Sequence, residues 1–218
     1  MTGVDPAAYE AWYHTPRGRW IAECEFALLQ RLLRPAAGAS LLDVGCGSGH
    51  FSRRYAAAGL RVTGLDRDTA LLAYARSRDD QVTYLHGDAL ALPCADGACD
   101  HCAAITSLCF ISEPARALAE LLRVARRSVV LGLLHRHSLL YRQKCGQGGY
   151  RGARWDTVTD VRRWLAATGH TSTTTLRAGH ALWLPSGNTV ARLTERLLPA
   201  ACPGGGFLAI ALHHKTAA

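Results

Sequence analysis

Leu41-Leu42-Asp43-Val44-Gly45-Cys46-Gly47-Ser48-Gly49 is the stretch of this 218-residue chain that decides the fold. A short apolar run with a carboxylate near its end is followed by a glycine at every second position. The run predicts a buried strand, and the glycines predict a tight turn into a helix. Because glycine has no Cβ, the backbone of this turn can approach a ligand closely. We therefore expect a nucleotide-like cofactor to lie against it.

The spacing of the glycines distinguishes between two kinds of ligand. Dinucleotide-binding turns follow the pattern G-x-G-x-x-G and place a pyrophosphate on the helix N-terminus. Here the third glycine comes one residue earlier, and Asp43 precedes the turn. A carboxylate at this place disfavours a phosphate and suits a cation. S-adenosylmethionine (SAM) carries an ammonium and a sulfonium group and no phosphate, so it fits this charge pattern better. Residues 43–49 resemble motif I of the class I, Rossmann-like, SAM-dependent methyltransferases.

Further segments resemble the same family in the order that it requires. Residues 61–66 are similar to the second strand, at whose end the family uses a carboxylate to hold both ribose hydroxyls. Residues 82–93 are similar to the third strand and the loop after it, where an aspartate and its neighbour contact the adenine. An acidic turn with a fourth strand at 96–107 and a Glu-x-x-Arg-Val sequence at 120–124 follow. The likeness covers residues 9–135.

The resemblance implies both an activity and a set of cofactor-binding residues. The chain is similar to the small methyltransferases of the type 11 group, so we expect methyl transfer from SAM to a small-molecule acceptor. The residues expected to bind SAM are Asp43, Gly45, Cys46, Gly47, Gly49, Asp66, Arg67, Asp88, Ala89 and Thr106.

Other functions stay open at this point. The net charge of +8 would suit a methyltransferase acting on RNA or protein. The positive residues are scattered, however, and no Asn-Pro-Pro-Tyr-like tetrad follows the fourth predicted strand, so a nucleic-acid partner is not expected. A SAM-binding regulatory protein without catalysis is a second alternative. An NAD-dependent oxidoreductase is disfavoured by the glycine spacing.

The alternation of predicted strands and helices indicates the fold class. It implies parallel strands, right-handed crossovers and helices on both faces of the sheet. With the resemblance, we expect a doubly wound, mostly parallel, seven-stranded α/β sheet. Two late apolar runs, near 181–184 and 207–212, are the expected antiparallel closing strands. We predict one domain over 1–218, with an N-terminal helical lid at 1–37, a cofactor-binding core at 38–135, and a substrate-side loop and closing strands at 136–218.

For methyl transfer, the main task of the protein is to align the acceptor with the methyl group of the cofactor. Proximity and orientation can supply about 7–11 kcal/mol of such a barrier, so a dedicated base is optional. If the acceptor carries a proton, a nearby histidine or tyrosine could accept it. His135 and His137 follow the predicted fifth strand, and Tyr13 belongs to the predicted lid. These three are the candidate catalytic residues, and a structural role for each stays open.

A basic segment follows the fifth predicted strand, from Arg136 to Arg154, and is rich in glycine. It predicts either a solvated loop or a clamp for an anionic substrate at the mouth of the site.

The eight cysteines are dispersed through apolar segments of a chain too large to need disulfides, so we expect reduced thiols. The spacing of Cys94, Cys99 and Cys102, with Cys109 later, matches a plant-type iron–sulfur pattern, but small apolar fillers explain it as well. His135 and His137 with Cys145 lack a fourth ligand at a recognisable spacing. We therefore predict no metal. The sequence shows neither a leader nor an apolar run long enough to span a bilayer, so we expect a cytoplasmic protein.

Overall fold

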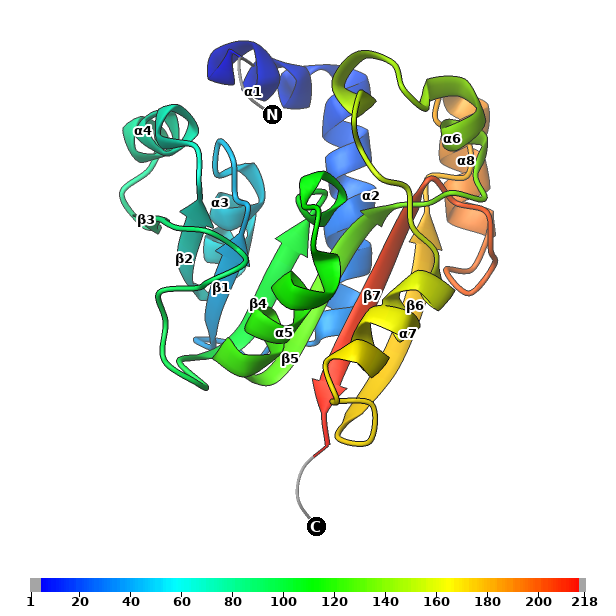
Figure 1. Ribbon diagram of the computed structural model, residues 1–218. Coiled ribbons are helices and arrows are strands. Elements are labelled where there is room, and N and C mark those ends of the chain that lie inside the picture. The colour runs from blue at the N-terminus through cyan, green and yellow to red at the C-terminus, as the bar shows by residue number, and fades with distance from the viewer. Residues whose placement is uncertain (1–4, 216–218) are drawn as a thin grey trace.

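The computed structural model describes residues 5–215, which form a seven-stranded sheet with helices on both faces (Figure 1). The strand order is β3-β2-β1-β4-β5-β7-β6. Neighbouring strands from β3 to β5 in this order are parallel, whereas β7 is antiparallel to both β5 and β6. The predicted doubly wound, mostly parallel fold is confirmed. The strands are β1 (Ser40–Val44), β2 (Arg61–Asp66), β3 (Thr83–His86), β4 (Cys99–Ile105), β5 (Ala125–Leu134), β6 (Thr174–Ala181) and β7 (Phe207–His214).

Local capping signals fix where several helices begin. The Asp68 side chain accepts hydrogen bonds from two backbone N–H groups at the start of α4, and Thr157 and Asp160 form a capping box at the start of α7. The helices are α1 (Pro6–His14), α2 (Pro16–Leu33), α3 (His50–Ala57), α4 (Thr69–Arg78), α5 (Pro114–Val124), α6 (Leu139–Lys144), α7 (Val158–Ala167) and α8 (Thr189–Leu197), with the short 3₁₀ helices η1 (Leu108–Phe110) and η2 (Gly148–Tyr150).

The core lies in two layers, one on each face of the sheet. Successive side chains of a strand point to opposite faces, so Leu41 joins one apolar cluster and Leu42 the other. The first cluster contains side chains of α2, α3 and α4, and the second contains those of α5 and α7. In Figure 1, α5 and α7 lie in front of the sheet and α2 lies behind it. Because both faces are covered, a ligand reaches the sheet at its carboxyl edge, where the strand-end loops meet.

The two helices of the predicted lid, residues 1–37, lie in different places in the structure. α2 packs along the sheet and buries Leu28, Leu29 and Leu33 in the core. Its helical apolar spacing therefore marks a core face and not a cover over the site. α1 lies beyond the carboxyl ends of the strands, at the top of Figure 1. The part of the predicted lid that covers this edge is α1, while residues 1–4 lie outside the described part of the chain.

The C-terminal elements differ in part from their predicted positions. β7 includes the predicted run at 207–212, but β6 ends at Ala181 instead of passing through 181–184. β6 is an edge strand in which Thr175, Arg177 and Ala178 are exposed, so this part of it carries few apolar residues. α8 is not predicted from the sequence, since its Val190, Leu193 and Leu197 side chains are exposed and mark no buried face. Within residues 5–215, no helix combines the length and apolar character that crossing a membrane needs.

Candidate cofactor and acceptor site

A cavity of about 640 Å³ opens at the carboxyl edge of the sheet. Its wall combines the turn after β1, the ends of β2 and β4, the loop after β3, and side chains of α1 and α3. This volume is in the usual range for small-ligand sites. All ten predicted cofactor-binding residues except Gly49 line it.

The three glycines of motif I serve different purposes. All have positive φ, at +75° for Gly45, +55° for Gly47 and +79° for Gly49, which favours glycine at each place. A Cβ on Gly45 would collide with the Ser107 side chain, and one on Gly49 would meet the hydroxyl of Tyr84. A Cβ on Gly47 would meet no protein atom within 4 Å. Gly45 and Gly49 are thus required by packing, whereas Gly47 keeps the cavity open to a ligand.

Asp66 ends β2 and is held in a fixed orientation by the backbone. Its Oδ2 accepts a hydrogen bond from the Gly47 N–H at 2.8 Å, and its Oδ1 accepts one from the Asp68 N–H at 2.9 Å. The carboxylate is therefore positioned beside the motif I turn, with its neighbour Arg67 also on the cavity wall. A carboxylate can accept further hydrogen bonds at each oxygen, as binding of two ribose hydroxyls would require.

Asp43 lies deeper, at the floor of the cavity. Its side chain is 1% exposed, and its Oδ2 accepts a hydrogen bond from Ser52 Oγ at 2.6 Å. Burial raises the pKa of Asp43 to about 6, although the bond from Ser52 opposes the rise. A cation entering the cavity would favour its charged form, in agreement with the charge argument from the sequence.

The remaining predicted contacts come from loops after β3 and β4. Asp88 and Ala89 lie on the cavity wall, and Asp88 Oδ1 accepts a hydrogen bond from the Leu90 N–H at 2.9 Å. Thr106 adopts φ +49°, a left-handed conformation that non-glycine residues rarely take. Its N–H donates to the Gly132 carbonyl at 2.8 Å, which joins the end of β4 to β5. Cys46 lines the cavity, and burial raises the pKa of its thiol.

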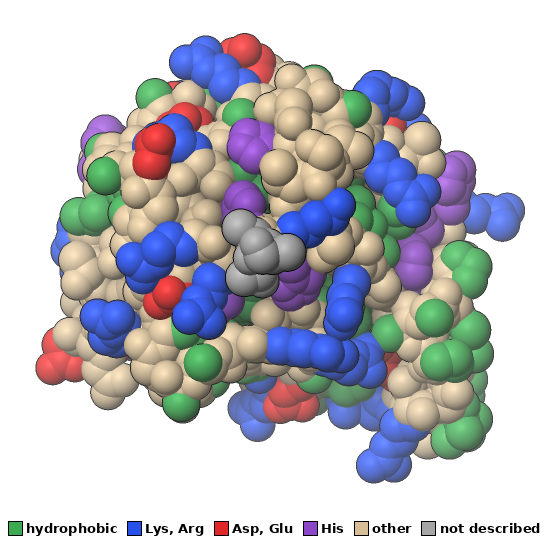
Figure 2. Space-filling model, turned by 90° about the horizontal axis from the view of Figure 1, so that it is seen from below, with side chains coloured by type: hydrophobic (Ala, Val, Ile, Leu, Met, Phe, Trp, Pro, Cys, Tyr) green, Lys and Arg blue, Asp and Glu red, His purple; other side chains and the backbone are tan. Residues whose placement is uncertain are grey.

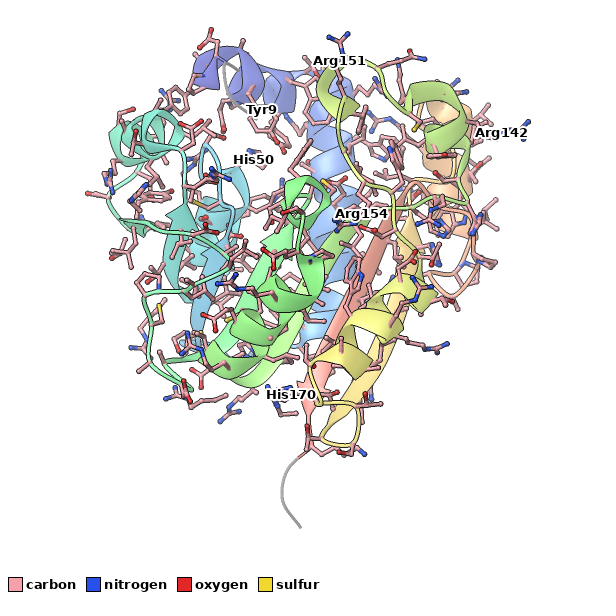
Figure 3. All side chains as sticks on the ribbon, viewed as in Figure 1. Tyr9, His50, Arg142, Arg151, Arg154 and His170 are labelled. Atoms are coloured by element: carbon pink, nitrogen blue, oxygen red, sulfur yellow. The ribbon has the colours of Figure 1, made fainter. Side chains whose placement is uncertain are left out.

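An aromatic and apolar wall closes the opposite side of the cavity. Figure 3 shows Tyr9 on α1 and His50 at the start of α3 pointing into the same space below α1. Tyr13, the predicted lid residue, also lines the cavity, and its hydroxyl lies 3.1 Å from that of Tyr9. The other members of this wall are Phe51, Phe110 and Ile111.

The two predicted catalytic histidines are not part of the cavity. His135 is buried, and its Nδ1 lies 3.0 Å from the Gly205 carbonyl oxygen. Its ring lies 4.6 Å from that of His180, and burial lowers its pKa to about 4. His137 is exposed. Neither lines the cavity, because the chain after β5 turns toward α6 and away from motif I. His135 and His137 therefore lie apart from the cavity, whereas Tyr13 lines it; a catalytic role for any of the three stays a prediction.

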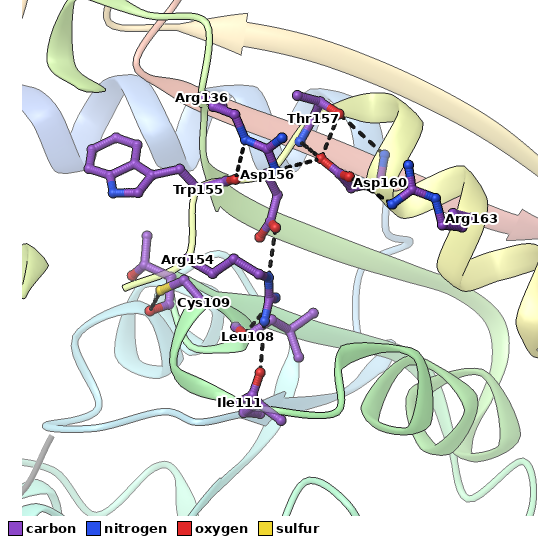
Figure 4. A network of polar contacts seen from close by, with 11 residues as sticks. Leu108, Cys109, Ile111, Arg136, Arg154, Trp155, Asp156, Thr157, Asp160 and Arg163 are labelled. Atoms are coloured by element: carbon purple, nitrogen blue, oxygen red, sulfur yellow. Dashed lines mark hydrogen bonds and ion pairs between the residues drawn. The ribbon is translucent and has the colours of Figure 1, made fainter. Parts of the chain in front are cut away.

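The basic segment after β5 supports the cavity from outside. Arg154 donates to the carbonyl oxygens of Ile111 and Leu108, at 2.7 and 2.9 Å, and to Asp156 Oδ1 at 2.7 Å (Figure 4). It thereby fixes η1, from which Phe110 reaches the cavity wall. These bonds give Arg154 a structural role and occupy the guanidinium that a clamp for an anionic substrate would need.

The other positive charges are spread over the surface. Arg142 and Arg151 are exposed and do not line the cavity (Figure 3). On the side away from the cavity, Figure 2 shows lysine and arginine side chains interspersed with acidic and apolar ones. Across residues 5–215, no group of three or more His, Cys, Asp or Glu side chains is arranged to hold a metal ion, and all eight cysteines are free.

The sequence and the fold of this chain were compared with those of known proteins. A family model described as "Methyltransferase domain" matches residues 42–132. A SAM-dependent methyltransferase of Thermotoga maritima, described as a possible histamine N-methyltransferase, superimposes with a TM-score of 0.77 at 23% identity, covering 96% of each chain. Residues 42–132 thus match a methyltransferase domain, and the chain has the class I methyltransferase fold. The resemblance seen in its sequence is confirmed.

Two further comparisons bear on the cofactor and on length. Magnesium protoporphyrin IX methyltransferase of Synechocystis, solved with bound S-adenosylhomocysteine (SAH), matches the methyltransferase domain with a TM-score of 0.62 at 17% identity, over 92% of this chain and 84% of that one. The family match supports SAM as the cofactor of this chain. Malonyl-[acyl-carrier protein] O-methyltransferase of Pectobacterium atrosepticum is 42% identical over 114 residues, which are 49% of this chain and 45% of the relative. The chain spans about half the length of the curated relatives that it matches.

The cavity fits SAM on its own geometry. The open face of Gly47 leaves room for a ligand against the turn, and Asp66 and Asp88 present carboxylates at the ends of β2 and β3. Sequence reasoning found these residues because their spacing is local. It missed Glu10 and His50, whose roles depend on α1 folding back over α3; the only sequence signal was a carboxylate among aromatic residues in α1.

Proposed function

We propose that this protein transfers a methyl group from SAM to a small-molecule acceptor. The observation that carries the proposal is that one cavity of about 640 Å³ holds both the motif I turn and an aromatic wall under α1. SAM, when bound, supplies a methyl carbon already activated by its sulfonium group. The task left to the protein is to align an acceptor with that carbon and to keep water out.

The wall of the cavity supports an acceptor of a particular kind. Tyr9, Tyr13, Phe51 and Phe110 present ring surfaces, and the one arginine or lysine on the wall is Arg67, beside the expected ribose position. An uncharged, flat acceptor fits such a wall better than an anionic one. We therefore propose an aromatic or otherwise apolar molecule that carries a hydroxyl or amine.

The predicted division of the chain is retained as part of the proposal, with one change. Residues 38–135 hold the cofactor, α1 covers the acceptor, and residues 136–218 support the acceptor wall through Arg154 and complete the sheet with β6 and β7. We also propose a cytoplasmic location, because eight free cysteines suit a reducing compartment.

Two measurements test the function. Calorimetry should show SAH binding to the wild-type protein and an affinity loss of about 1.5–3 kcal/mol in Asp66→Ala, since hydrogen bonds to a charged group are lost. Asp96→Ala is the matched control, because Asp96 is an exposed carboxylate paired with Arg123. Unchanged SAH affinity in Asp66→Ala would contradict the assignment of Asp66 as a cofactor-binding residue.

Incubation with isotopically labelled SAM and separate acceptors tests turnover. The acceptors are phenol, benzylamine, thiophenol, bulk RNA and a mixed protein sample, with products identified by mass spectrometry. We expect label in a small molecule. Label in RNA that disappears at high salt would instead favour a nucleic-acid methyltransferase. SAH binding without any methylated product would favour a regulatory SAM-binding protein.

A further inference from the structure

A histidine that sequence reasoning missed stands at the acceptor side of the cavity. His50 is the first residue of α3 and follows the motif I turn directly. Its ring stacks on that of Tyr13, with centroids 3.6 Å apart and planes at 10°. This contact fixes the plane of the imidazole, so its two nitrogens have defined directions.

One of these nitrogens faces a carboxylate. Nδ1 of His50 lies 3.3 Å from Oε1 of Glu10, which α1 brings down onto the turn. Glu10 is 4% exposed and accepts further hydrogen bonds from Ser48 Oγ and Arg53 Nη2, each at 2.6 Å. Burial raises the pKa of Glu10, but these partners outweigh it and bring the pKa down to about 2. A carboxylate that is always charged accepts hydrogen bonds only, so the proton of a neutral His50 resides on Nδ1.

The other nitrogen has no partner. Nε2 of His50 is buried and forms no hydrogen bond with any residue in the described part of the chain. A buried polar atom left this way costs about 1–3 kcal/mol, and a catalytic role is one explanation for such an atom. Burial also lowers the pKa of His50, against the opposing effect of Glu10. The imidazole is therefore neutral near pH 7, with a free lone pair on Nε2.

The tyrosines that flank His50 and the Cys109 thiol are unsuited to accept a proton. The hydroxyls of Tyr13 and Tyr9 are hydrogen-bonded to each other, and burial raises the pKa of both. Burial raises the pKa of the Cys109 thiol to about 12, and this thiol donates to the Thr106 carbonyl.

We propose that Nε2 of His50, which is buried in this structure and must be uncovered by a local shift of the cavity wall when an acceptor enters, accepts the proton of the acceptor's hydroxyl or amine during methyl transfer, and that Glu10 is its positioning residue. This proposal rests on the proposed function. The acceptor's oxygen or nitrogen forms the new bond to the methyl carbon as the carbon–sulfur bond breaks, and that electron pair stays on sulfur to give SAH. The acceptor proton moves to Nε2, and the resulting imidazolium is stabilised by the Glu10 carboxylate until water removes the proton.

The protonation state of His50 can be measured without an acceptor. NMR of protein with ¹⁵N-labelled histidine, saturated with SAH near pH 7, should show His50 neutral, with Nδ1 protonated and Nε2 bare. The pKa of His50 should fall in Glu10→Gln, because the neighbouring negative charge is lost. A doubly protonated imidazole, or a proton on Nε2 in the wild-type protein, would overturn the proposal.

Kinetics then separate a base from a structural residue. In mildly alkaline buffer phenol and benzylamine must lose a proton on methylation, whereas thiophenol is already a thiolate. In His50→Gln, kcat should fall about 10²–10⁴-fold for phenol and benzylamine and less than about threefold for thiophenol, with SAH affinity unchanged. His170→Gln, at the opposite end of the molecule (Figure 3), is the control.

The possible outcomes distinguish a failure of the proposed role of His50 from a failure of the proposed methyltransferase function. Equal losses for all three acceptors, or no loss, would overturn the role of His50 and leave the methyltransferase intact. Failure of the wild-type protein to bind SAH would overturn the proposed function itself. SAH binding without methylation of any of the three would contradict both the proposed acceptor class and the role of His50.

Discussion

Alanine at Gly45 and alanine at Gly47 should damage different properties of the protein. Both positions have positive φ, which costs an L-residue roughly 1–2 kcal/mol. At Gly45 the new Cβ also collides with Ser107, and overpacking of this kind adds about 1–3 kcal/mol. We therefore expect Gly45→Ala to lower the free energy of unfolding by about 2–5 kcal/mol and Gly47→Ala by about 1–2 kcal/mol.

SAH affinity, in contrast, should be lowered by Gly47→Ala for a steric reason that lies in the ligand and not in the protein. At Gly47 the Cβ meets no protein atom, so its steric cost falls on the ligand. An overpacking cost of about 1–3 kcal/mol there corresponds to roughly 5- to 150-fold weaker SAH binding. Urea denaturation and calorimetry with SAH measure the two quantities.

Gly38→Ala is the matched control, because Gly38 has φ +73° and an open Cβ position in the turn before β1, away from the cavity. It should show the backbone strain alone, with SAH affinity unchanged. Wild-type SAH affinity in Gly47→Ala, or Gly45→Ala no less stable than Gly38→Ala, would refute this account of the turn.

Three further substitutions test the surrounding structure. Arg154→Met should lower the free energy of unfolding by about 3–5 kcal/mol, because it leaves buried Asp156 without its charged partner; urea denaturation should show a change within about 0.5 kcal/mol for the exposed Arg163→Met. Burial raises the pKa of Asp43 from its ordinary 3.8 to about 6 in the folded protein, so folding favours the protonated form and the stability that it contributes is lost as pH rises between these values. Asp43→Asn should therefore gain about 2 kcal/mol relative to wild type between pH 4 and pH 7, seen in denaturation curves at several pH values. Thr157→Ala should cost about 1 kcal/mol by removing a capping box, and an unchanged melting temperature would contradict that role.

The cofactor side of the site could be predicted from the sequence because its signals are local. Motif I, Asp66 and Asp88 each follow a predicted strand, and parallel strands bring their carboxyl ends to one edge. Spacing alone therefore placed these residues together, before any knowledge of side-chain packing.

The acceptor side could not be predicted in the same way. Glu10 and His50 are 40 residues apart and meet only because α1 folds back over the turn. His135 stands at a strand end as predicted, yet strand periodicity does not say where the chain goes next, and after β5 it leads to Gly205 and His180. α2 was taken for a cover because its apolar spacing is the same whether it packs on a ligand or on a sheet.

The polar contacts of α1 with the motif I turn and α3 converge on one carboxylate, and this has a consequence for turnover. Glu10 contacts Ser48, His50 and Arg53 together, so lifting α1 breaks all three contacts at once instead of one after another. Product departure would then be an all-or-none event, and its frequency would set an upper bound on the rate at which fresh acceptor enters.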